Sequence, residues 1–360
     1  MRTEALQFQA ASSTYRWCAP DLAAGVPRHT LRGDPDPRGV AEQIDRILDE
    51  VRPSTVAVPG WYDWRALILL RSARRKGVPL ILMSDSQRID AARSFWREYP
   101  KRILLRQFAA ALVGGRRHLD YLHELGMPRE AVRPGYDVVD NAHFRRAAGG
   151  CTRRGVGRRL LACNRLVEKK NLARLIAAVA RHNGQAPAAE RFTLTIVGDG
   201  PLRGELEAEA RALAPGQVVF EGHVDHADLP ACYASADAFI LASTVEQWGL
   251  VVNEAMAAGL PVLVSTACGC APELVVDGEN GFVFDPSSAE SIAEAIGRLP
   301  TAPAELSAMG RASEHIIADW TPERFADEFV RAMALAAGDR RRWSRFDEAA
   351  TGVLARSLRP

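Results

Sequence analysis

Two glutamates with seven residues between them, Glu246 and Glu254, bracket a turn whose residue types suit the binding of a phosphate group. Gly249 lies between them and lets the backbone approach a ligand closely. The N–H groups of Leu250 and Val251 follow at a helix N-terminus, where anions bind well. Because a carboxylate is a poor partner for phosphate, we expect the two acids to hold hydroxyl groups on either side of it. A diphosphate flanked by two polyols is a nucleotide sugar, and this is the ligand that the pattern predicts.

A strand, a loop and a helix are needed to position this turn. Residues 238–242 are an apolar run with the length of a buried strand, and residues 243–249 supply a polar loop. From Leu250 the pattern becomes helical, and Gly259 followed by Pro261 ends the helix before the next strand. An ordinary β-α-β crossover with two solvated acids has the same pattern. The elements alone therefore leave both interpretations open.

The segment Glu-Gln-Trp-Gly-Leu-Val-Val-Asn-Glu-Ala, residues 246–255, resembles the Glu-x7-Glu signature of retaining family 4 glycosyltransferases of the GT-B fold. The resemblance spans about residues 50–335 and is specific in residues 160–285. It implies an α/β chain with two Rossmann-like parallel-sheet domains facing across a cleft, the donor being held in the second. Within this fold the resemblance implies that Glu246 holds the sugar hydroxyls and Glu254 the ribose.

A cationic loop lies between a strand at residues 159–163 and a helix at residues 172–180. The family has an arginine at this strand end and a lysine about five residues later, which correspond to Arg165 and Lys170. As the C1–O bond of the donor breaks, negative charge grows on the departing diphosphate, and fixed cations lower that barrier. We expect these side chains to take the role that a metal ion has elsewhere, so no metal site is predicted. A loop with no role in binding is the alternative.

Three further positions complete the predicted site. Gly198 lies in a Gly-Asp-Gly-Pro turn after a strand, where the backbone is able to approach a ligand. The resemblance places Val224 beside the nucleobase, with nearby main-chain groups reading its edge. Asp85 follows the strand at residues 79–83, where many family members have a histidine. We expect Asp85 to orient the acceptor or act as a base, and the alternative is a helix N-cap.

Other polar and thiol residues are expected to be structural. His118 lies in the first turn of a predicted helix, where we expect a surface histidine, and the alternative is that it faces the cleft. Glu273 is predicted to order local structure, and Cys268 with Cys270 to be packing residues.

Alternating strands and helices from residue 40 onwards favour parallel sheets. We expect an acceptor-side domain at residues 1–147, a linker at 148–157 and a donor domain at 158–320. Helices at residues 321–360 are expected to cross back onto the first domain. The family's first strand and glycine loop are not recognisable in the opening residues. Either the first domain is shortened or the gene start is placed too late.

The net charge of +2 is unevenly distributed. Residues 1–155 carry 26 Lys and Arg against 17 Asp and Glu, which leaves 20 against 27 in the remainder. A basic first half indicates an anionic partner. In residues 89–112, arginines interleave with aromatic residues, which fits either contact with anionic lipid headgroups or a solvated helix that packs its aromatics inward. No nucleic-acid-binding module is recognised, so nucleic acid is not an expected partner.

The bulk features predict a cytoplasmic protein. No apolar run approaches the 18 or so residues of a membrane helix, and the first 20 residues lack the apolar stretch of a signal peptide. The six cysteines are scattered, as is typical of reduced thiols. Peripheral contact with the inner face of the membrane, through the basic first domain, is a further expectation.

These features predict metal-independent, retaining transfer of a sugar from a UDP- or GDP-sugar to an acceptor hydroxyl, with no cofactor. The product would belong to polysaccharide, glycolipid or glycosylated small-molecule biosynthesis. A nucleotide-sugar epimerase, a phosphorylase and a donor-binding subunit without activity remain alternatives with the same architecture.

Overall fold

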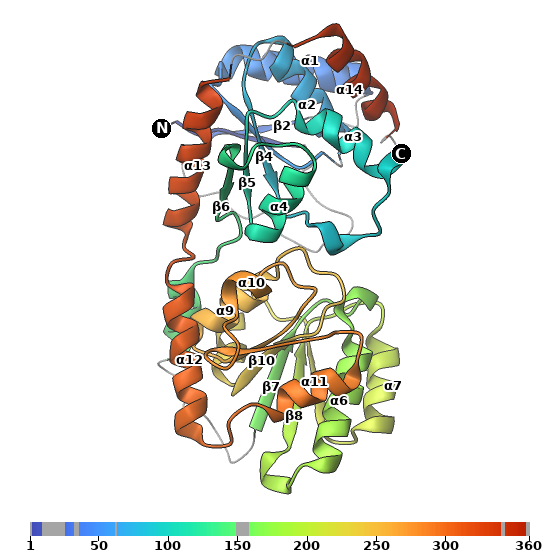
Figure 1. The fold of residues 1–360 in the computed structure, drawn as a ribbon, viewed down its shortest axis with the longest axis vertical. Helices are drawn as coiled ribbons and strands as arrows, with labels where there is room; N and C mark the ends of the chain where they lie inside the picture. The colour runs from blue at the N-terminus through green and yellow to red at the C-terminus, as the bar shows by residue number, and fades with distance from the viewer. Residues whose placement is uncertain are drawn as a thin grey trace.

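The computed structural model describes residues 2–8, 26–31, 36–61, 63–148, 158–339 and 343–357. The predicted linker at residues 148–157 lies, apart from Ala148, outside the described residues. In the described part the chain forms two α/β bodies stacked along the long axis of the molecule, each around its own parallel sheet (Figure 1).

The second body is built on a six-stranded sheet in the order β12-β11-β10-β7-β8-β9, with every neighbouring pair parallel. The order reverses between β7 and β10, as it does in dinucleotide-binding sheets, and such a switch point is where ligands bind at the carboxyl ends of the strands. The strands are β7 (Arg158–Cys163), β8 (Phe192–Val197), β9 (Val218–Gly222), β10 (Ala238–Leu241), β11 (Val262–Ser265) and β12 (Gly281–Phe284).

Helices cover both faces of this sheet, because successive side chains of a strand point to opposite faces. Along β7, Leu160 is part of the core on one face of the sheet and Leu161 is part of the core on the other face. Both side chains are buried. The helices are α6 (Leu172–Gln185), α7 (Arg203–Leu213), α8 (Leu229–Ala234), α9 (Leu250–Ala257), α10 (Ala271–Leu274), α11 (Ala289–Gly297) and α12 (Pro303–Ile317).

The first body has a four-stranded parallel sheet in sequential order, β3-β4-β5-β6. Its helix α1 begins at Pro37, where the Asp36 side chain caps it by accepting a bond from Gly39 N at 2.8 Å. The elements are β3 (Val56–Pro59), β4 (Leu80–Ser84), β5 (Ala110–Val113), β6 (Val132–Pro134), α1 (Pro37–Val51), α2 (Trp64–Arg75), α3 (Phe95–Leu105) and α4 (Arg116–Glu124).

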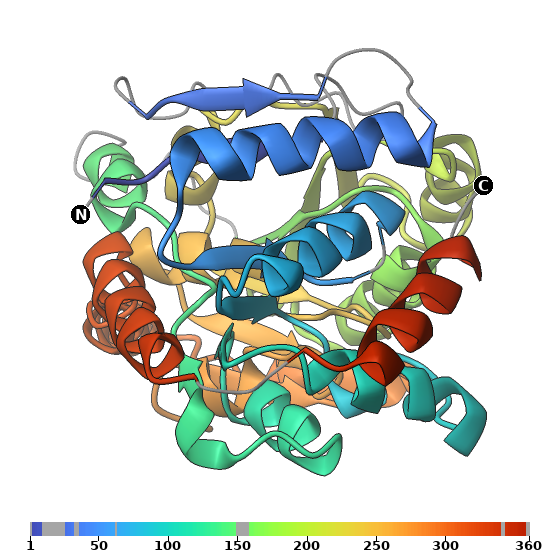
Figure 2. The same cartoon turned by 90° about the horizontal axis from the view of Figure 1, so that it is seen from above.

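The opening residues form a separate pair of short parallel strands, β1 (Ala5–Gln7) and β2 (Arg28–Thr30), rather than a strand of the four-stranded sheet. Leu6 and Phe8 pack against the core of the first body. In the view of Figure 2, β2 lies above helix α1, at the top of the molecule.

Two segments pass between the bodies. Helix α5 (Asn141–Ala148), which the predicted boundary at residue 147 assigned to the first domain, packs on α8 and α9. Its Phe144 is buried in the core of the second body, which explains the placement. At the other end of the chain, α12 packs on α9, and α13 (Pro322–Ala337) returns along β4, β5 and β6 (Figure 1).

The returning segment is fastened to the first body by apolar and charged contacts. Ala332 and Ala336 of α13 are fully buried against Ile81 and Ala110. Helix α14 (Arg345–Ser357) then lies against α2 and α3. Among the described residues, no helix is both long and apolar enough to cross a membrane.

Candidate functional site

The loops that follow β7 and β10 meet at the switch point of the six-stranded sheet. Lys170 Nζ forms an ion pair with Glu246 Oε2 across them, with side-chain exposures of 15% and 11%. Ser243 Oγ donates to the same carboxylate oxygen at 2.9 Å. The structure thus brings together two of the predicted site residues, which lie on different loops of the chain.

Backbone contacts fix these two loops to one another. Asn171 adopts a left-handed conformation at the start of α6, with φ of 59°. Its side-chain amide donates to the carbonyl oxygens of Ala242 at 3.0 Å and Pro286 at 2.8 Å. Thr244 N donates to Lys169 O at 2.9 Å. These bonds hold Lys170 and Glu246 in place from both sides.

The tip of helix α9 lies beside this ion pair. Gly249 has φ of +107°, and a Cβ there would lie 2.9 Å from Leu241 Cδ2, so the turn requires glycine. Helix α9 begins at Leu250, which leaves the first N–H groups, including those of Leu250 and Val251, without partners inside the helix. Such groups are donors for an anion.

Glu254 lies deeper along α9, where it is half-buried. Tyr233 donates its hydroxyl proton to Glu254 Oε2 at 2.6 Å. Burial raises the pKa of Glu254 to about 7, and the hydrogen bond from Tyr233 opposes that rise. The side chain therefore changes its charge near neutral pH.

Asn164, which the sequence patterns did not single out, follows β7 directly at the switch point. Its side chain is 7% exposed, and neither its Oδ1 nor its Nδ2 has a hydrogen-bond partner in the described structure. A buried amide without partners is costly, so such a group in a native fold calls for an explanation. Arg165 follows it and is exposed to solvent.

The remaining predicted donor residues have structural neighbours of their own. Gly198 has φ of +129°, and a Cβ there would overlap the carbonyl oxygen of Asn164. Glycine is thus required at position 198 because the backbone there lies close to the loop that bears Asn164 and Arg165. Val224 is partly buried against the core that also contains Trp248.

Residues of the first body hold the backbone of the Glu246 loop. Gln87, which is fully buried, donates from Nε2 to Glu246 O at 2.8 Å and to Ala267 O at 3.3 Å. His118 Nε2 lies 2.9 Å from Gln247 O. Two side chains from the first body therefore fasten consecutive carbonyl groups of the predicted donor loop.

The prediction that His118 is a surface residue is wrong. Its side chain is fully buried, with the ring centroid 5.9 Å from that of Trp248. Gly115 N donates to His118 Nδ1 at 3.0 Å, so the neutral ring carries its proton on Nε2 and donates it to Gln247 O. Burial lowers the pKa of His118, which favours this neutral form.

An acidic pair from the first body lies near His118. Asp85 follows β4, and Asp137 lies beyond β6. Asp137 is 9% exposed, and its Oδ2 has no hydrogen-bond partner among the described residues. Burial, together with the charge of Asp85, raises the pKa of Asp137 to about 8. Asp137 is therefore mainly protonated at neutral pH.

Glu273 joins the two bodies as well as ordering its own turn. Its Oε1 accepts bonds from Arg116 N at 2.7 Å and Arg116 Nε at 3.1 Å. Cys268 and Cys270 are both free and buried in the core, as expected of packing residues.

Known proteins resemble this chain in sequence over its second half and in fold over most of its length. Residues 155–315 match the family model "Glycosyl transferases group 1". Over 173 residues the chain is 35% identical to the GDP-mannose-dependent alpha-(1-6)-phosphatidylinositol monomannoside mannosyltransferase of Mycolicibacterium smegmatis. That alignment covers 45% of this chain and 44% of the relative, so this chain spans less than half of the relative's length.

Solved structures extend the likeness to both bodies. The structure of HepE from Anabaena, in complex with UDP and glucose, gives a TM-score of 0.66 at 19% identity and covers 86% of each chain. Sucrose-phosphate synthase from Thermosynechococcus elongatus gives 0.69 at 21% identity, covering 84% of this chain and 82% of that one. The chain therefore has the GT-B fold of two parallel-sheet domains, and residues 155–315, within its second half, match the group 1 glycosyltransferase model.

Proposed function

We propose that the protein transfers a sugar from a nucleoside-diphosphate sugar to an acceptor hydroxyl, with retention of the anomeric configuration and without a metal ion. The observation that carries the proposal is the Lys170–Glu246 ion pair at the switch point, beside the tip of α9. A cation and helix N–H groups suit a diphosphate, and the carboxylate suits sugar hydroxyls.

Each residue of the site then has a distinct role. The diphosphate binds to Lys170, to Arg165 and to the N–H groups of Leu250 and Val251, which stabilise the charge that grows on the leaving group. Glu246, released from Lys170 by the incoming phosphate, accepts hydrogen bonds from the sugar. In this arrangement the Lys170–Glu246 pair keeps each charge balanced until the donor arrives.

Two other side chains are proposed to contact the donor. Glu254 binds the ribose, and its hydrogen bond from Tyr233 orients the carboxylate for this purpose. Asn164 has an unmet donor and an unmet acceptor at the carboxyl end of β7, beside the proposed diphosphate position. The donor's polar groups would satisfy that amide. Asp85 and Asp137 lie on the acceptor side, at the edge of the first domain.

The names of similar proteins support a UDP- or GDP-sugar as the donor. One relative is named GDP-mannose-dependent, and one structural neighbour was solved with UDP and glucose. The acceptor hydroxyl is then part of a polysaccharide, a glycolipid or a glycosylated small molecule. The chain is proposed to do this in the cytoplasm.

Binding and turnover in matched lysine variants test the proposal. Lys170→Ala should weaken UDP or GDP binding in calorimetry and slow sugar transfer or donor hydrolysis by about 100-fold. Lys169→Ala is the control, because Lys169 is exposed and its backbone carbonyl, not its side chain, contacts Thr244. Equal nucleotide affinity in the two variants would refute the role of Lys170. Conversion of the donor sugar without any acceptor would instead favour an epimerase.

A further inference from the structure

Helix α3 exposes a group of aromatic side chains. The exposed fractions are 66% for Phe95, 82% for Trp96 and 47% for Tyr99, and Ile89 just before the helix is 53% exposed. The Phe95 ring lies 5.5 Å from Trp96 and 5.6 Å from Tyr99, measured between ring centroids. The alternative that the aromatics of residues 89–112 pack inward is therefore wrong for Phe95, Trp96 and Tyr99, although Phe108 is buried in the core as that alternative has it. Large apolar side chains that gather on a surface mark an interaction site.

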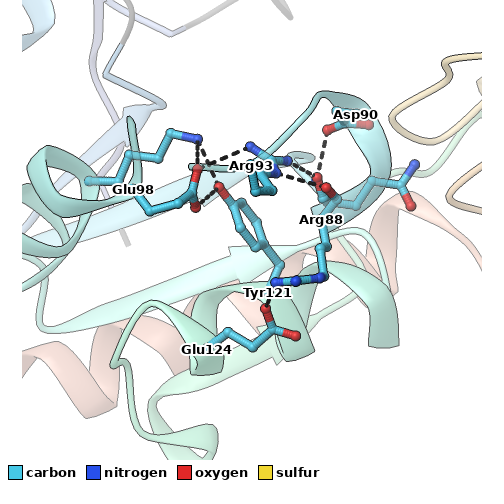
Figure 3. A network of polar contacts seen from close by, with 8 residues as sticks. Arg88, Asp90, Arg93, Glu98, Tyr121 and Glu124 are labelled. Atoms are coloured by element: carbon cyan, nitrogen blue, oxygen red, sulfur yellow. Dashed lines mark hydrogen bonds and ion pairs between the residues drawn. The ribbon is translucent and has the colours of Figure 1, made fainter. Parts of the chain in front are cut away.

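A polar network explains why the aromatics face outward (Figure 3). Tyr121 of α4 donates its hydroxyl proton to Glu98 at 2.7 Å, and Lys101 pairs with Glu98 at 3.0 Å. The guanidinium of Arg93 lies over the Tyr121 ring, 4.4 Å from its centroid. Polar and charged side chains that pair with one another thus occupy the side of α3 that faces α4.

The network also fixes the segment ahead of the helix. Arg93 donates to the carbonyl oxygens of Gln87 and of Arg88, the latter at 2.7 Å. Arg88 in turn pairs with Glu124 of α4 at 2.6 Å (Figure 3). The base of the aromatic surface is therefore held in place, and docking would not first have to order it.

The exposed charged residues of this region are all cationic. Residues 88–106 contain six Lys and Arg against two acids. Both acids are engaged on the inner side, where Glu98 accepts from Tyr121 and Asp90 accepts from Gln87 N at 2.8 Å. Arg97 and Arg102 are exposed on the same helix as the aromatics.

We propose that this surface, defined by Ile89, Phe95, Trp96, Tyr99, Arg97 and Arg102 and here named the α3 surface, docks on an anionic lipid bilayer. Aromatic rings enter the boundary between headgroups and acyl chains, and the arginines bind lipid phosphates. Charge complementarity selects this occupant, because the exposed charged side chains on the helix that carries the rings are cationic, and an anionic bilayer supplies matching charge.

Vesicle co-sedimentation of the full chain tests the proposal. Phosphatidylcholine vesicles with about 30% phosphatidylglycerol should bind the protein, and pure phosphatidylcholine vesicles should bind it far more weakly, since the attraction to anionic lipid is partly electrostatic. The triple variant Phe95→Ser, Trp96→Ser, Tyr99→Ser should lose about tenfold or more in apparent affinity. The double variant Arg97→Glu, Arg102→Glu should lose the preference for the anionic vesicles.

A matched control removes exposed apolar side chains elsewhere. Leu213 and Val219 of the second domain are 48% and 42% exposed, and the variant Leu213→Ser, Val219→Ser should bind vesicles like the wild type. Nucleotide affinity should be unchanged in all three variants, which separates this proposal from that of the donor site. Wild-type protein that ignores anionic vesicles, or a triple variant that still binds them, overturns it. Light scattering that shows dimers dependent on the aromatics, without vesicle binding, assigns the surface to a second copy and also overturns it.

Discussion

Glu254 is the residue whose protonation is most directly linked to nucleotide binding. With its pKa raised to about 7 by burial, it must lose its proton before it accepts bonds from two ribose hydroxyls. We expect UDP or GDP affinity to fall as the pH drops below about 7, by up to about tenfold per pH unit. Calorimetry in two buffers of different ionisation enthalpy should count close to one more proton released near pH 6 by the wild type than by Glu254→Gln.

The variant Glu254→Gln isolates this effect, because the nucleotide's own phosphate titrates equally in both proteins. Its affinity should be lower than that of the wild type at pH 8, and the two affinities should converge towards pH 5.5. If the wild type and Glu254→Gln show parallel pH profiles, Glu254 does not contact the nucleotide as an anion.

Asp137 should limit stability as the pH rises. Its folded pKa of about 8 is above that of an unfolded aspartate, so the folded state holds the proton more tightly. Stability is therefore lost as the pH rises from about 4 to about 8, with a slope of roughly 1.4 kcal/mol per pH unit, and levels off above that. Asp137→Asn removes this dependence, so its gain in Tm over the wild type should grow from pH 5 to pH 8.

The exposed Asp120 provides the control for this measurement, since Asp120→Asn should show a Tm difference that does not change with pH. Asp85→Asn should flatten the dependence in part, because it removes the like charge that helps to raise the pKa of Asp137. A Tm gain of Asp137→Asn that is constant across this pH range would contradict the account.

At the residue scale, sequence predicted the groups that follow a motif and missed those defined by their surroundings. Glu246 and Lys170 were assigned through a resemblance, and the structure places them in contact. Asn164, Asp137 and Gln87 were not predicted, because a buried and unpaired polar atom is a property of the folded chain. No spacing or composition signal at these positions distinguishes them from surface residues.

At the scale of elements, the loop after β10 depends on a side chain of the other domain. Gln87→Ala removes the bond to Glu246 O, which lies in the donor loop. We expect the extra affinity that the sugar gives to a nucleotide sugar to fall by about tenfold, the cost of one buried hydrogen bond. Affinity for the bare nucleotide should stay unchanged, because its proposed contacts lie in the second domain.

Gln107→Ala is the matched control for that experiment. Gln107 is also buried, but its amide donates to Asp347 of α14 at 2.8 Å, on another contact of the first domain. This variant should lose stability and keep the wild-type ratio of nucleotide-sugar to nucleotide affinity. If the ratio of nucleotide-sugar to nucleotide affinity fell equally in Gln87→Ala and Gln107→Ala, Gln87 would act only through stability.

Element boundaries were predictable where strong local signals exist. The start of the strand at Ala238 and the start of α9 at Leu250 agree between sequence and structure. The short strand β2 is not predicted, because three residues carry too little periodicity to identify a strand. His118 was misplaced for a related reason: its burial comes from Trp248, which reaches it only in the folded chain.

At the scale of the whole molecule, the return of α13 holds the two domains to one another. Ala332 is fully buried between α13 and the first sheet. Ala332→Glu would bury a charge without a partner and should lower the free energy of unfolding by about 3 kcal/mol or more. Val330→Glu, at a position of the same helix that is 50% exposed, is the control and should be nearly neutral in thermal unfolding. Equal effects of the two variants would show that α13 does not pack on this sheet in solution.

The two-domain α/β architecture follows from alternating strand and helix patterns, which are local properties of the chain. The path of the chain between the domains cannot be predicted from these local patterns. Phe144 of α5 packs into the second body although it precedes the first strand of that body. The strand order of the six-stranded sheet also required the structure, since periodicity identifies strands but not their neighbours.

The central claim is that a diphosphate binds between the tip of α9 and the cationic loop after β7. A crystal structure of the protein with UDP or GDP tests it most directly. We expect phosphate oxygens within hydrogen-bond distance of Lys170 Nζ and of the N–H groups of Leu250 and Val251, with the ribose at Glu254. A nucleotide bound away from Gly249 and Lys170 would contradict it.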